Sequence, residues 1–306
     1  MAISITVLGS SSATPTSSRH PSSFLFKSDK RKDYFLIDCG EGTQILMRRA
    51  RVRMQCISRI FITHLHGDHF FGLIGFISSQ NLLGRKEELH IYAHRPLKKV
   101  INLLLKVEKT VLNYPLIFHA IPSKKKKNTL YEDDSIEVTT FPLVHSMPTN
   151  GFLFREKGMT RMVNEDFLNT YNPSAKQISS IKNGNDFTAP NGEILKNNSI
   201  TFLCDDSKSY AHCSDTIYTE TILPYIYNVD LLYHETTFMD ELADVAKEKY
   251  HSTAKQAAQI AVLANAKKLL IGHYSARYKD LKPLIAEAKS VFPKTLAAYE
   301  GDTIKV

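Results

Sequence analysis

Short apolar runs alternate with segments of helical periodicity along most of the chain. Apolar runs bounded by polar or turn-forming residues predict strands at Ile3–Leu8, Ser23–Lys27, Tyr34–Ile37, Arg59–Ile62, Leu89–Tyr92, Leu116–Ala120, Ile136–Thr140, Gly151–Phe154, Ser199–Cys204, Asp230–Tyr233 and Lys268–Ile271. Apolar residues at intervals of three and four predict helices at Thr43–Ala50, Phe70–Leu83, Leu97–Glu108, Asp215–Tyr227, Thr253–Asn265 and Leu281–Val291. The fourth of these helices could begin one turn later. Strands and helices in this order are typical of an α/β fold.

One segment interrupts this pattern. Residues Arg155–Asn198 are mainly polar, with turn-forming stretches such as Asn172-Pro173-Ser174 and Pro190-Asn191-Gly192. A stretch of this length without strong periodicity inside a compact domain is either disordered or a functional projection. We favour a projection. We therefore expect one catalytic domain over residues 1–306, with a substrate-binding arm inserted at residues 155–198.

Composition narrows the class of protein. The chain has 306 residues, of which 43% are hydrophobic, so it can bury a sizeable core. No apolar run approaches the roughly 18 residues that cross a bilayer, and the run Met1–Gly9 alternates like a first strand and lacks the features of a secretory leader. The four cysteines form no Cys-x-x-Cys pair, so neither a zinc ribbon nor a disulfide framework is indicated. We expect a cytoplasmic protein with reduced cysteines and no membrane partner.

The charge balance bears on the choice of substrate. The net charge is +8 and the isoelectric point is near 9.1. A basic surface favours polyanions, because it neutralises phosphates and releases counterions. Lysine-rich proteins also reach this charge without binding nucleic acid, so both interpretations stay open on charge alone. The run Lys124–Lys127 is interpreted as a solvated loop.

The strongest chemical signal is the stretch His64-Leu65-His66-Gly67-Asp68-His69, which follows the apolar run ending at Ile62. It places three imidazoles and a carboxylate on a turn between a predicted strand and a predicted helix. Imidazole nitrogen and carboxylate oxygen are ligands that Zn²⁺ accepts at about 2.0–2.2 Å. His64 and His66 can converge on one ion, while Asp68 and His69 face a second direction, which indicates two metals. The alternative is a solvated loop or a capped helix start.

Three further candidates stand just after apolar runs, where loops leave a sheet. They are His145, Asp215 and His273. Taken singly, each could be an ordinary loop residue. Together with the first cluster they complete a plausible set, since Asp215 can bridge two ions while His145 and His273 complete one ion each.

These motifs resemble a known family. The His64–His69 cluster is similar to the signature of the metallo-β-lactamase superfamily, whose fold is an αβ/βα sandwich with metals between the sheet edges. More specific stretches resemble the ribonuclease Z family of tRNA 3′-processing endoribonucleases. They are Leu36–Gln44, His234–Phe238 with His251–Ala254, and Gly272–Tyr278. The match runs from the first strand to about Tyr278.

The resemblance implies roles for individual residues. One Zn²⁺ would be held by His64, His66 and His145, and a second by Asp68, His69 and His273, giving two Zn²⁺ per subunit. Asp215 would bridge the two ions, and Asp38 would orient a ligand from behind. The resemblance also implies a homodimer whose protruding arm is supplied by Arg155–Asn198, and precursor tRNA as the substrate.

The chemistry fits this assignment. Two ions roughly 3.5–4 Å apart generate a hydroxide and stabilise an in-line phosphoryl transition state. His251 is the candidate general acid for the leaving ribose oxygen, with Glu235 orienting it or raising its pKa. Asp68 could also receive the proton of the water. The alternative for His251 is that it caps a helix beginning near Ser252.

Two stretches depart from the family pattern. Arms of the family carry a Gly-Pro-Leu stretch, whereas this chain reads Ile178–Gly184 at that place, and the early loop Pro15–His20 lacks the lysine and asparagine of the family. The substrate-binding candidates in these regions are Arg19, His20, Lys176 and Lys182.

We therefore expect a zinc-dependent endoribonuclease that removes the 3′ trailer of precursor tRNA and leaves a 3′-hydroxyl after the discriminator base. Two alternatives stay open. The chain could be another metallo-β-lactamase-fold hydrolase, acting on a small phosphodiester, thioester or lactone. It could also be a non-catalytic RNA-binding protein.

Overall fold

The computed structural model describes residues 3–122, 127–158, 160–204 and 207–306. The chain divides into two compact units. Residues 2–155 and 208–306 form the larger unit, and residues 156–207 form the smaller one. Lys124–Lys126, three of the four residues interpreted above as a solvated loop, lie outside the described residues.

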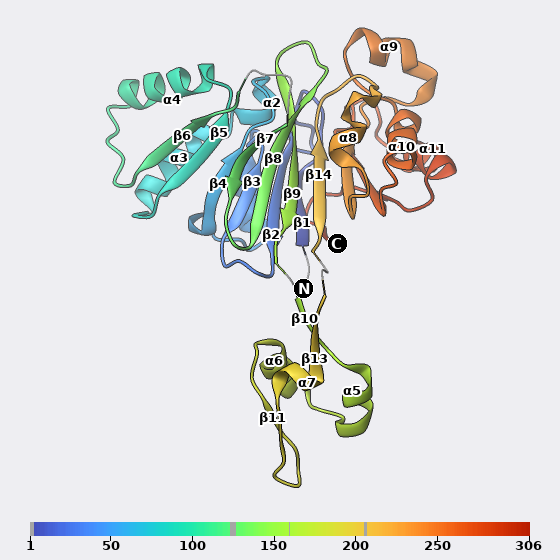
Figure 1. Cartoon of the computed structure of the whole chain (residues 1–306). Coiled ribbons are helices and arrows are strands. Elements are labelled where there is room, and N and C mark those ends of the chain that lie inside the picture. Colours follow the sequence, from blue (N-terminus) through green and yellow to red (C-terminus); the bar gives the residue numbers. More distant parts are fainter. Residues whose placement is uncertain (1–2, 123–126, 159, 205–206) are drawn as a thin grey trace. The chain divides into compact units, whose positions relative to one another are not determined.

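The larger unit contains two seven-stranded sheets among the described residues (Figure 1). The first has the order β18-β1-β2-β3-β4-β5-β6. Strands β3 to β6 are parallel, and β18, β1, β2 and β3 pair antiparallel. The bounds are β1 Ile3–Gly9, β2 Ser23–Ser28, β3 Tyr34–Ile37, β4 Ile57–Phe61, β5 Leu89–Ala93, β6 Leu116–Ala120 and β18 Thr303–Lys305.

The second sheet has the order β17-β16-β15-β14-β9-β8-β7. Strands β14 to β17 are parallel, whereas β14 pairs antiparallel with β9, and β7 with β8. The bounds are β7 Asn128–Glu132, β8 Ile136–Leu143, β9 Thr149–Glu156, β14 Ser209–Cys213, β15 Leu231–Glu235, β16 Lys268–Gly272 and β17 Thr295–Ala297. In both sheets the carboxyl ends of the parallel strands share one edge, which is where loop residues can converge.

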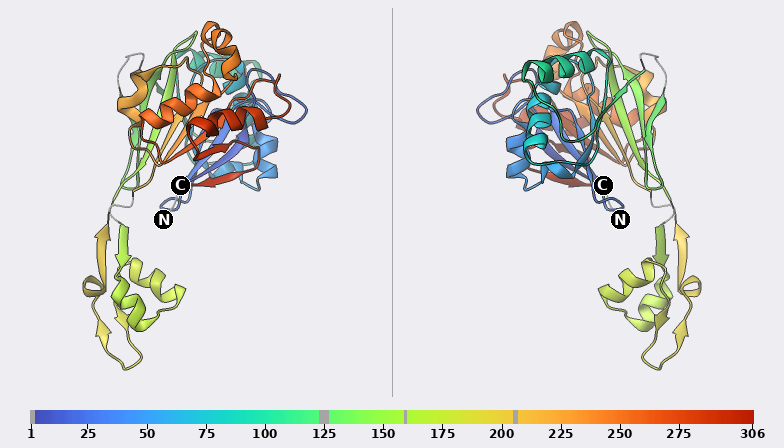
Figure 2. Two further views of the ribbon diagram at one scale, coloured as in Figure 1. Left: turned by 90° about the vertical axis from the view of Figure 1, so that its right-hand side faces the viewer. Right: turned by 90° about the vertical axis from the view of Figure 1, so that its left-hand side faces the viewer.

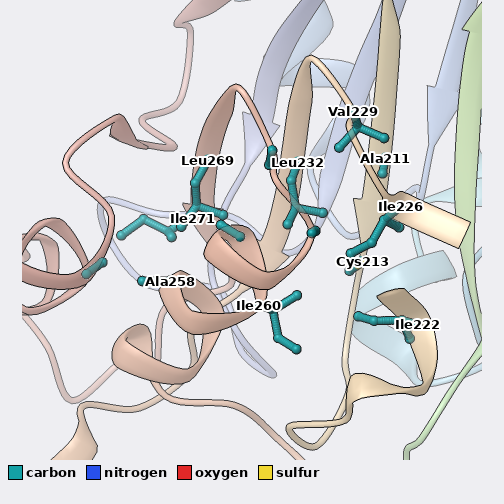
Figure 3. Packing of buried hydrophobic residues seen from close by; sticks show 14 of the residues in the cluster. Ala211, Cys213, Ile222, Ile226, Val229, Leu232, Ala258, Ile260, Leu269 and Ile271 are labelled. Atoms are coloured by element: carbon teal, nitrogen blue, oxygen red, sulfur yellow. The ribbon is translucent and has the colours of Figure 1, made fainter. Parts of the chain in front are cut away.

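Helices cover the outer face of each sheet, as two further views show (Figure 2). The first sheet carries α1 Thr43–Arg49, α2 Gly67–Phe70, α3 Leu73–Leu82 and α4 Pro96–Val107. The second carries α8 Leu223–Ile226, α9 Ala243–Glu248, α10 Ala254–Leu263 and α11 Lys282–Val291. The helix layer over the second sheet packs through side chains such as Ile260, Leu269 and Ile271 (Figure 3).

An aromatic-rich core fills the space between the sheets. Phe24, Phe26 and Phe61 from the first sheet meet Phe154 and Tyr233 from the second. The architecture is therefore an αβ/βα sandwich, which confirms the fold class expected from the sequence. None of the described helices has the length and apolar character needed to cross a bilayer.

Two predicted helices are wrong in extent. The helix expected over Asp215–Tyr227 is a loop followed by a 3-10 turn at Glu220–Ile222 and the short α8. The helix expected over Phe70–Leu83 is interrupted after Phe70, because Gly72 lies against the Gly40 carbonyl, where a Cβ atom would be 2.1 Å from the oxygen. Strands β7, β14, β17 and β18 and helix α9 are additional to the prediction.

The smaller unit is ordered rather than structureless. Its elements are β10 Thr160–Val163, α5 Glu165–Tyr171, α6 Ala175–Lys182, β11 Phe187–Thr188, β12 Ile194–Leu195, α7 Asn197–Ile200 and β13 Thr201–Cys204. The predicted strand Ser199–Cys204 therefore begins two residues later, at Thr201. A small core of its own includes Phe167, Ile181 and Phe187, and a capping box between Ser174 and Gln177 starts α6.

Candidate metal centre and active site

The predicted ligands all lie in the larger unit, on loops that follow strands of both sheets. The turn after β4 carries His64, His66, Asp68 and His69, and the loop after β8 carries His145. Asp215 follows β14 and His273 follows β16. The structure therefore brings all seven predicted ligands to the shared strand-end edge.

One cluster contains His64, His66, His145 and Asp215. His66 Nδ1 lies 3.0 Å from His64 Nε2 and 3.2 Å from His145 Nε2. Asp215 Oδ2 lies 3.6 Å from His64 Nε2 and 3.8 Å from His145 Nε2. Three ring nitrogens and one carboxylate oxygen thus surround a common point, which is a four-ligand arrangement of the kind zinc prefers.

A second cluster contains Asp68, His69 and His273. Asp68 Oδ2 lies 3.4 Å from His69 Nε2 and 3.6 Å from His273 Nε2. The other oxygen of Asp215, Oδ1, lies 3.5 Å from His69 Nε2 and 3.3 Å from His273 Nε2. The two oxygens of Asp215 therefore face different clusters, as a bridging carboxylate must.

Hydrogen bonds on the far side of His64, His69 and His145 fix which nitrogen of each ring faces the cluster. The Nδ1 atoms of His69 and His145 donate to Asp38 Oδ2 at 2.7 Å and to the Tyr250 carbonyl at 2.8 Å. His64 Nδ1 lies 3.0 Å from the hydroxyl of Thr63, which itself donates to Asp38 at 3.0 Å. These contacts leave the Nε2 lone pairs for a metal, and they place Asp38 behind the ligands.

Two buried ring nitrogens without a partner indicate that these residues fit a metal ion. His69 Nε2 and His273 Nε2 are buried and have no hydrogen-bond partner within the described part of the chain. Buried polar atoms are nearly always satisfied in native proteins, so an unsatisfied pair facing two carboxylates calls for a bound partner. Neutral imidazoles and carboxylates are the donor set that Zn²⁺ takes.

The pKa values of the clustered histidines are shifted in opposite directions. Burial lowers the pKa of His64, His66 and His145, so these rings are neutral and ready to bind a cation. Burial would also lower the pKa of His69, but the carboxylates of Asp215, Asp38 and Asp68 outweigh it and raise that pKa well above its ordinary value. Metal binding at His69 would therefore displace a proton.

Backbone strain is concentrated around this site. Asp38 and His273 have positive φ angles of 56° and 62°, and Ala13, whose N–H donates to Asp68 Oδ2 at 2.9 Å, has a φ of 59°. Each such conformation costs a non-glycine residue about 1 kcal/mol or more and persists only where surrounding contacts impose it.

His251 and Glu235 form a buried pair beside the clusters. His251 Nδ1 donates to Glu235 Oε1 at 2.8 Å. Burial would lower the pKa of His251, but the Glu235 carboxylate outweighs it and raises the pKa to about 9. Glu235 is held by the N–H groups of Thr216, Thr237 and Ser252. The His251 imidazole is thus held in place by Glu235 and is protonated at neutral pH.

The helix-cap alternative for His251 is wrong. Helix α10 is capped by Thr253, whose hydroxyl accepts from the Gln256 N–H in a capping box. His251 lies two residues earlier, and one of its ring nitrogens comes within ligand range of Asp215 and His273. The structure therefore leaves His251 two possible roles, as a proton donor or as a metal ligand.

A cleft of about 730 Å³ opens over the clusters. Its walls include His66, Asp68, His145, Asp215, His251 and His273 together with Thr14, Glu41, Phe71, Phe238, Lys249 and Ser275. Of these neighbours, Phe238 is covered by the guanidinium of Arg277, 4.8 Å from its ring centre. The exposed ring of Phe71 and the nearby Lys249 are suited to a nucleotide substrate.

Arg19 and His20, two of the predicted substrate-binding residues, are not among the residues that line this cleft. Arg19 donates to the Ser275 carbonyl at 3.3 Å, and His20 Nδ1 lies 2.9 Å from Glu300 Oε2. Both residues are thus engaged in holding the early loop. Lys176 and Lys182 lie on α6 of the smaller unit, so their role in substrate binding stays a prediction.

Sequence reasoning missed the residues that position the ligands. Thr237 is the clearest case: its hydroxyl donates to Glu235 Oε2 at 2.7 Å and lies 3.0 Å from His273 Nδ1. Thr63 and the carbonyl of Tyr250 act in the same way for His64 and His145. The only sequence signal was the closeness of Thr63 and Thr237 to recognised motifs.

Comparison with known proteins places the chain in a family. It is 42% identical to ribonuclease Z of Bacteroides fragilis over 295 residues, which are 96% of this chain and 96% of that protein. It is 44% identical to ribonuclease Z of Porphyromonas gingivalis over 299 residues, covering 98% and 97% of the two chains. The chain belongs to the ribonuclease Z family. It also belongs to the family described as Anti-Pycsar protein Apyc1, whose profile matches residues 3–292.

Solved structures agree in fold. The short form of human tRNase Z superposes with a TM-score of 0.71 at 24% identity, covering 98% of each chain. The metallo-β-lactamase fold protein YhfI of Bacillus subtilis superposes with a TM-score of 0.70 at 18% identity, covering 100% of each chain. These superpositions confirm the expected metallo-β-lactamase fold, and the identity to the two relatives confirms the resemblance to the ribonuclease Z family.

Proposed function

We propose that this chain is a metal-dependent endoribonuclease that removes the 3′ trailer from precursor tRNA and leaves a 3′-hydroxyl after the discriminator base. The observation that carries the proposal is the position of Asp215, with one oxygen toward each histidine cluster and the protonated His251 in the same cleft. Membership of the ribonuclease Z family supports tRNA processing as the reaction.

Two Zn²⁺ per subunit are the cofactors we propose. His64, His66 and His145 would hold one ion, Asp68, His69 and His273 the other, and Asp215 would bridge them. When bound, such ions supply Lewis-acid stabilisation for the charge of a phosphodiester under attack by water. Asp38 would keep His69 oriented through its hydrogen bond.

His251 is proposed to donate the proton that the leaving ribose oxygen requires. Its Nδ1 is engaged by Glu235, which holds the ring protonated and leaves Nε2 for the substrate. Glu235 is a positioning residue in this scheme, because it acts through His251. A leaving 3′-oxygen is a poor leaving group unless it is protonated, so this donation gives the tRNA product its 3′-hydroxyl.

Asp68 is proposed to orient the attacking water. Burial would raise the pKa of Asp68, but His69 and His273 outweigh burial and hold it below its ordinary value. A carboxylate with a lowered pKa accepts a hydrogen bond well but retains a proton poorly. The base role expected for Asp68 is therefore narrowed to alignment of the water, with the final proton passed to solvent.

Hydrolysis of a small phosphodiester is the second candidate function. The observation that favours it is the charge of the insertion: residues 156–207 contain five lysines and arginines against seven aspartates and glutamates. A segment with this balance offers little net attraction to a polyanion. A non-catalytic RNA-binding role is disfavoured, because it would require no converging ligand set.

A homodimer is proposed as the assembly. An apolar groove between α3 and α4 is lined by Phe70, Phe71, Leu73, Ile74, Leu97, Val100, Ile101 and Leu104. Beside it Leu103 and Val107 are 60% and 70% exposed. Apolar surface of this kind on one helix face is typical of a protein interface, and a second copy is the partner that the family implies. The cytoplasmic location stays a prediction from the sequence.

The test is to incubate the zinc-loaded protein with a 3′-extended precursor tRNA and to map the cut. We expect a single cut after the discriminator base and a 3′-hydroxyl end. Asp215→Ala should lose the cut and much of its zinc, whereas Asp244→Ala, which changes an exposed carboxylate on α9, should lose neither. Turnover of bis-p-nitrophenyl phosphate without cleavage of the precursor would favour the second candidate.

A further inference from the structure

A second cavity, of about 690 Å³, lies in the larger unit beside the loops that carry the ligands. We call it the His94 pocket. Its lining is Leu65, His94, Arg95, Pro96, Ala120, Ile121, Pro122, Met147 and Pro148. Leu65 stands between His64 and His66, and Met147 follows His145 by two residues. The pocket and the cleft thus share two loops as common walls.

The pocket combines apolar walls with two polar groups. Leucine, isoleucine, methionine and three prolines supply most of its lining. His94 is 8% exposed, and the Asn150 side chain engages its ring, but its Nε2 has no hydrogen-bond partner among the residues described. Arg95 is exposed at the start of α4. A buried ring nitrogen without a protein partner is costly unless a bound molecule satisfies it.

These features suit a nucleotide. A volume of several hundred Å³ with apolar walls and a few polar groups is the usual form of a ligand pocket. A nucleobase presents flat apolar faces to such walls and a hydrogen-bonding edge to a group such as His94. An exposed guanidinium suits the phosphate attached to it. Single-stranded RNA is recognised through bases turned out of the stack in this way.

Resting on the proposed function, we propose that the His94 pocket receives one nucleobase of the RNA strand next to the cleaved bond, with Arg95 against the adjoining phosphate. Because the pocket and the cleft share two loops, an RNA strand bound in the cleft would run next to this pocket. The pocket would therefore set where the strand lies relative to the proposed ligands. The pocket would position the substrate, and the chemical step would take place in the cleft.

The test is to fill the pocket from an exposed position. Ala120, at the end of β6, lines the pocket and is exposed, so Ala120→Trp adds bulk there without disturbing the core. Ala286→Trp is the matched control, because Ala286 is an exposed alanine on α11 outside every cavity described here. Zinc content and melting temperature should be unchanged in both.

With precursor tRNA, Ala120→Trp should raise KM by about tenfold or more, the scale of one lost base contact. Ala286→Trp should leave KM unchanged, and both should hydrolyse bis-p-nitrophenyl phosphate normally. An abasic nucleotide placed in turn at the discriminator and at the first two trailer positions should reproduce the defect at one position only. At that position Ala120→Trp should add no further loss, since the two changes remove the same contact.

A binding measurement separates failure of this proposal from failure of the proposed function. Titration of the zinc-loaded protein with a nucleoside 5′-monophosphate should give about tenfold weaker binding for Ala120→Trp than for Ala286→Trp. Loss of that difference, or equal KM values for both variants with precursor tRNA, would overturn the nucleobase pocket. If the wild-type protein binds the nucleotide through this pocket but does not cut precursor tRNA, only the proposed function is contradicted.

Discussion

One hydroxyl group, that of Thr237, connects the proposed proton donor with a proposed metal ligand. It donates to Glu235 Oε2 and accepts from the Nδ1 side of His273, at 2.7 Å and 3.0 Å. The same carboxylate holds His251 through its other oxygen. A change at Thr237 should therefore affect both the proposed proton donor and the proposed metal ligand.

Thr237→Val should lower zinc affinity by about 10–100-fold, the usual effect of losing an outer hydrogen bond to a ligand. The His273 ring would lose the acceptor that fixes its tautomer. Thr237→Ser, which keeps the hydroxyl, should restore most of the affinity. Competition with a chromophoric chelator measures the constants, and equal affinities for the valine and serine variants would show that the hydroxyl has no such role.

His251→Ala distinguishes a proton donor from a ligand. A general acid contributes about 10²–10⁴-fold to the rate, so kcat on precursor tRNA should fall by that factor while zinc content stays near the wild-type value. The defect should shrink with bis-p-nitrophenyl phosphate, because p-nitrophenolate leaves without a proton. His273→Ala is the comparison, for which zinc loss is expected. Zinc loss in His251→Ala would mean that the residue is a ligand.

At the scale of elements, an ionic cluster connects the turn after β2 with the turn between β7 and β8. Arg31 makes two 2.9 Å contacts with Asp33 and also binds Asp133. Burial would raise the pKa of Asp133, but hydrogen bonds from Tyr131, Ser135 and Arg31 outweigh it and hold that pKa below its ordinary value. The stabilisation is thus present above the unfolded pKa of about 4 and is lost as pH falls below it.

Asp133→Asn should lower the free energy of unfolding by about 1 kcal/mol at pH 7, a modest amount because the carboxylate is partly exposed. The difference from wild type should begin to shrink below about pH 5, as the carboxylate of the unfolded chain takes up a proton, and should keep shrinking as pH falls toward the lowered pKa of the folded carboxylate. Urea unfolding of both proteins across this range measures it. A difference that does not change with pH would show that the ionised carboxylate is not the stabilising group.

The insertion can be tested as an element, since residues 156–207 have a core of their own. Replacing residues 157–207 by a short Gly/Ser linker should raise KM for precursor tRNA by about tenfold and spare bis-p-nitrophenyl phosphate. The log–log salt slope of tRNA binding should change by less than about 1, because the segment carries no excess of cations. Parallel losses on both substrates would instead mean that the insertion supports the cleft.

The sequence predicted elements where local signals decide the structure. Helix α10 was found because its apolar residues recur at intervals of three and four, and the ligands were found because each follows an apolar run that predicts a strand. The helix predicted over Asp215–Tyr227 is wrong at its start, because Asp215 belongs to the ligand cluster and lies in the loop that follows β14. Edge strand β17 has three residues and forms only by pairing with β16, so its own sequence could not indicate it.

The whole molecule offers one further prediction, on its assembly. Leu103 and Val107 project from α4 beside the apolar groove and are mostly exposed. Leu103→Glu should place a charge in a dimer interface and shift the protein to a monomer. Light scattering after size-exclusion chromatography gives the mass, and Val262→Glu, at a half-exposed valine on α10, is the control. A dimer that survives Leu103→Glu would place the interface elsewhere.

The ligand clusters also draw on both sheets: each combines residues from the turn after β4 with residues that follow strands of the second sheet. An ion held by such a set would act as a non-covalent cross-link across the top of the sandwich. Its binding energy would then be part of the folding energy, rising with the logarithm of free metal concentration. Depletion of such a metal should therefore lower the melting temperature of the protein as well as its activity.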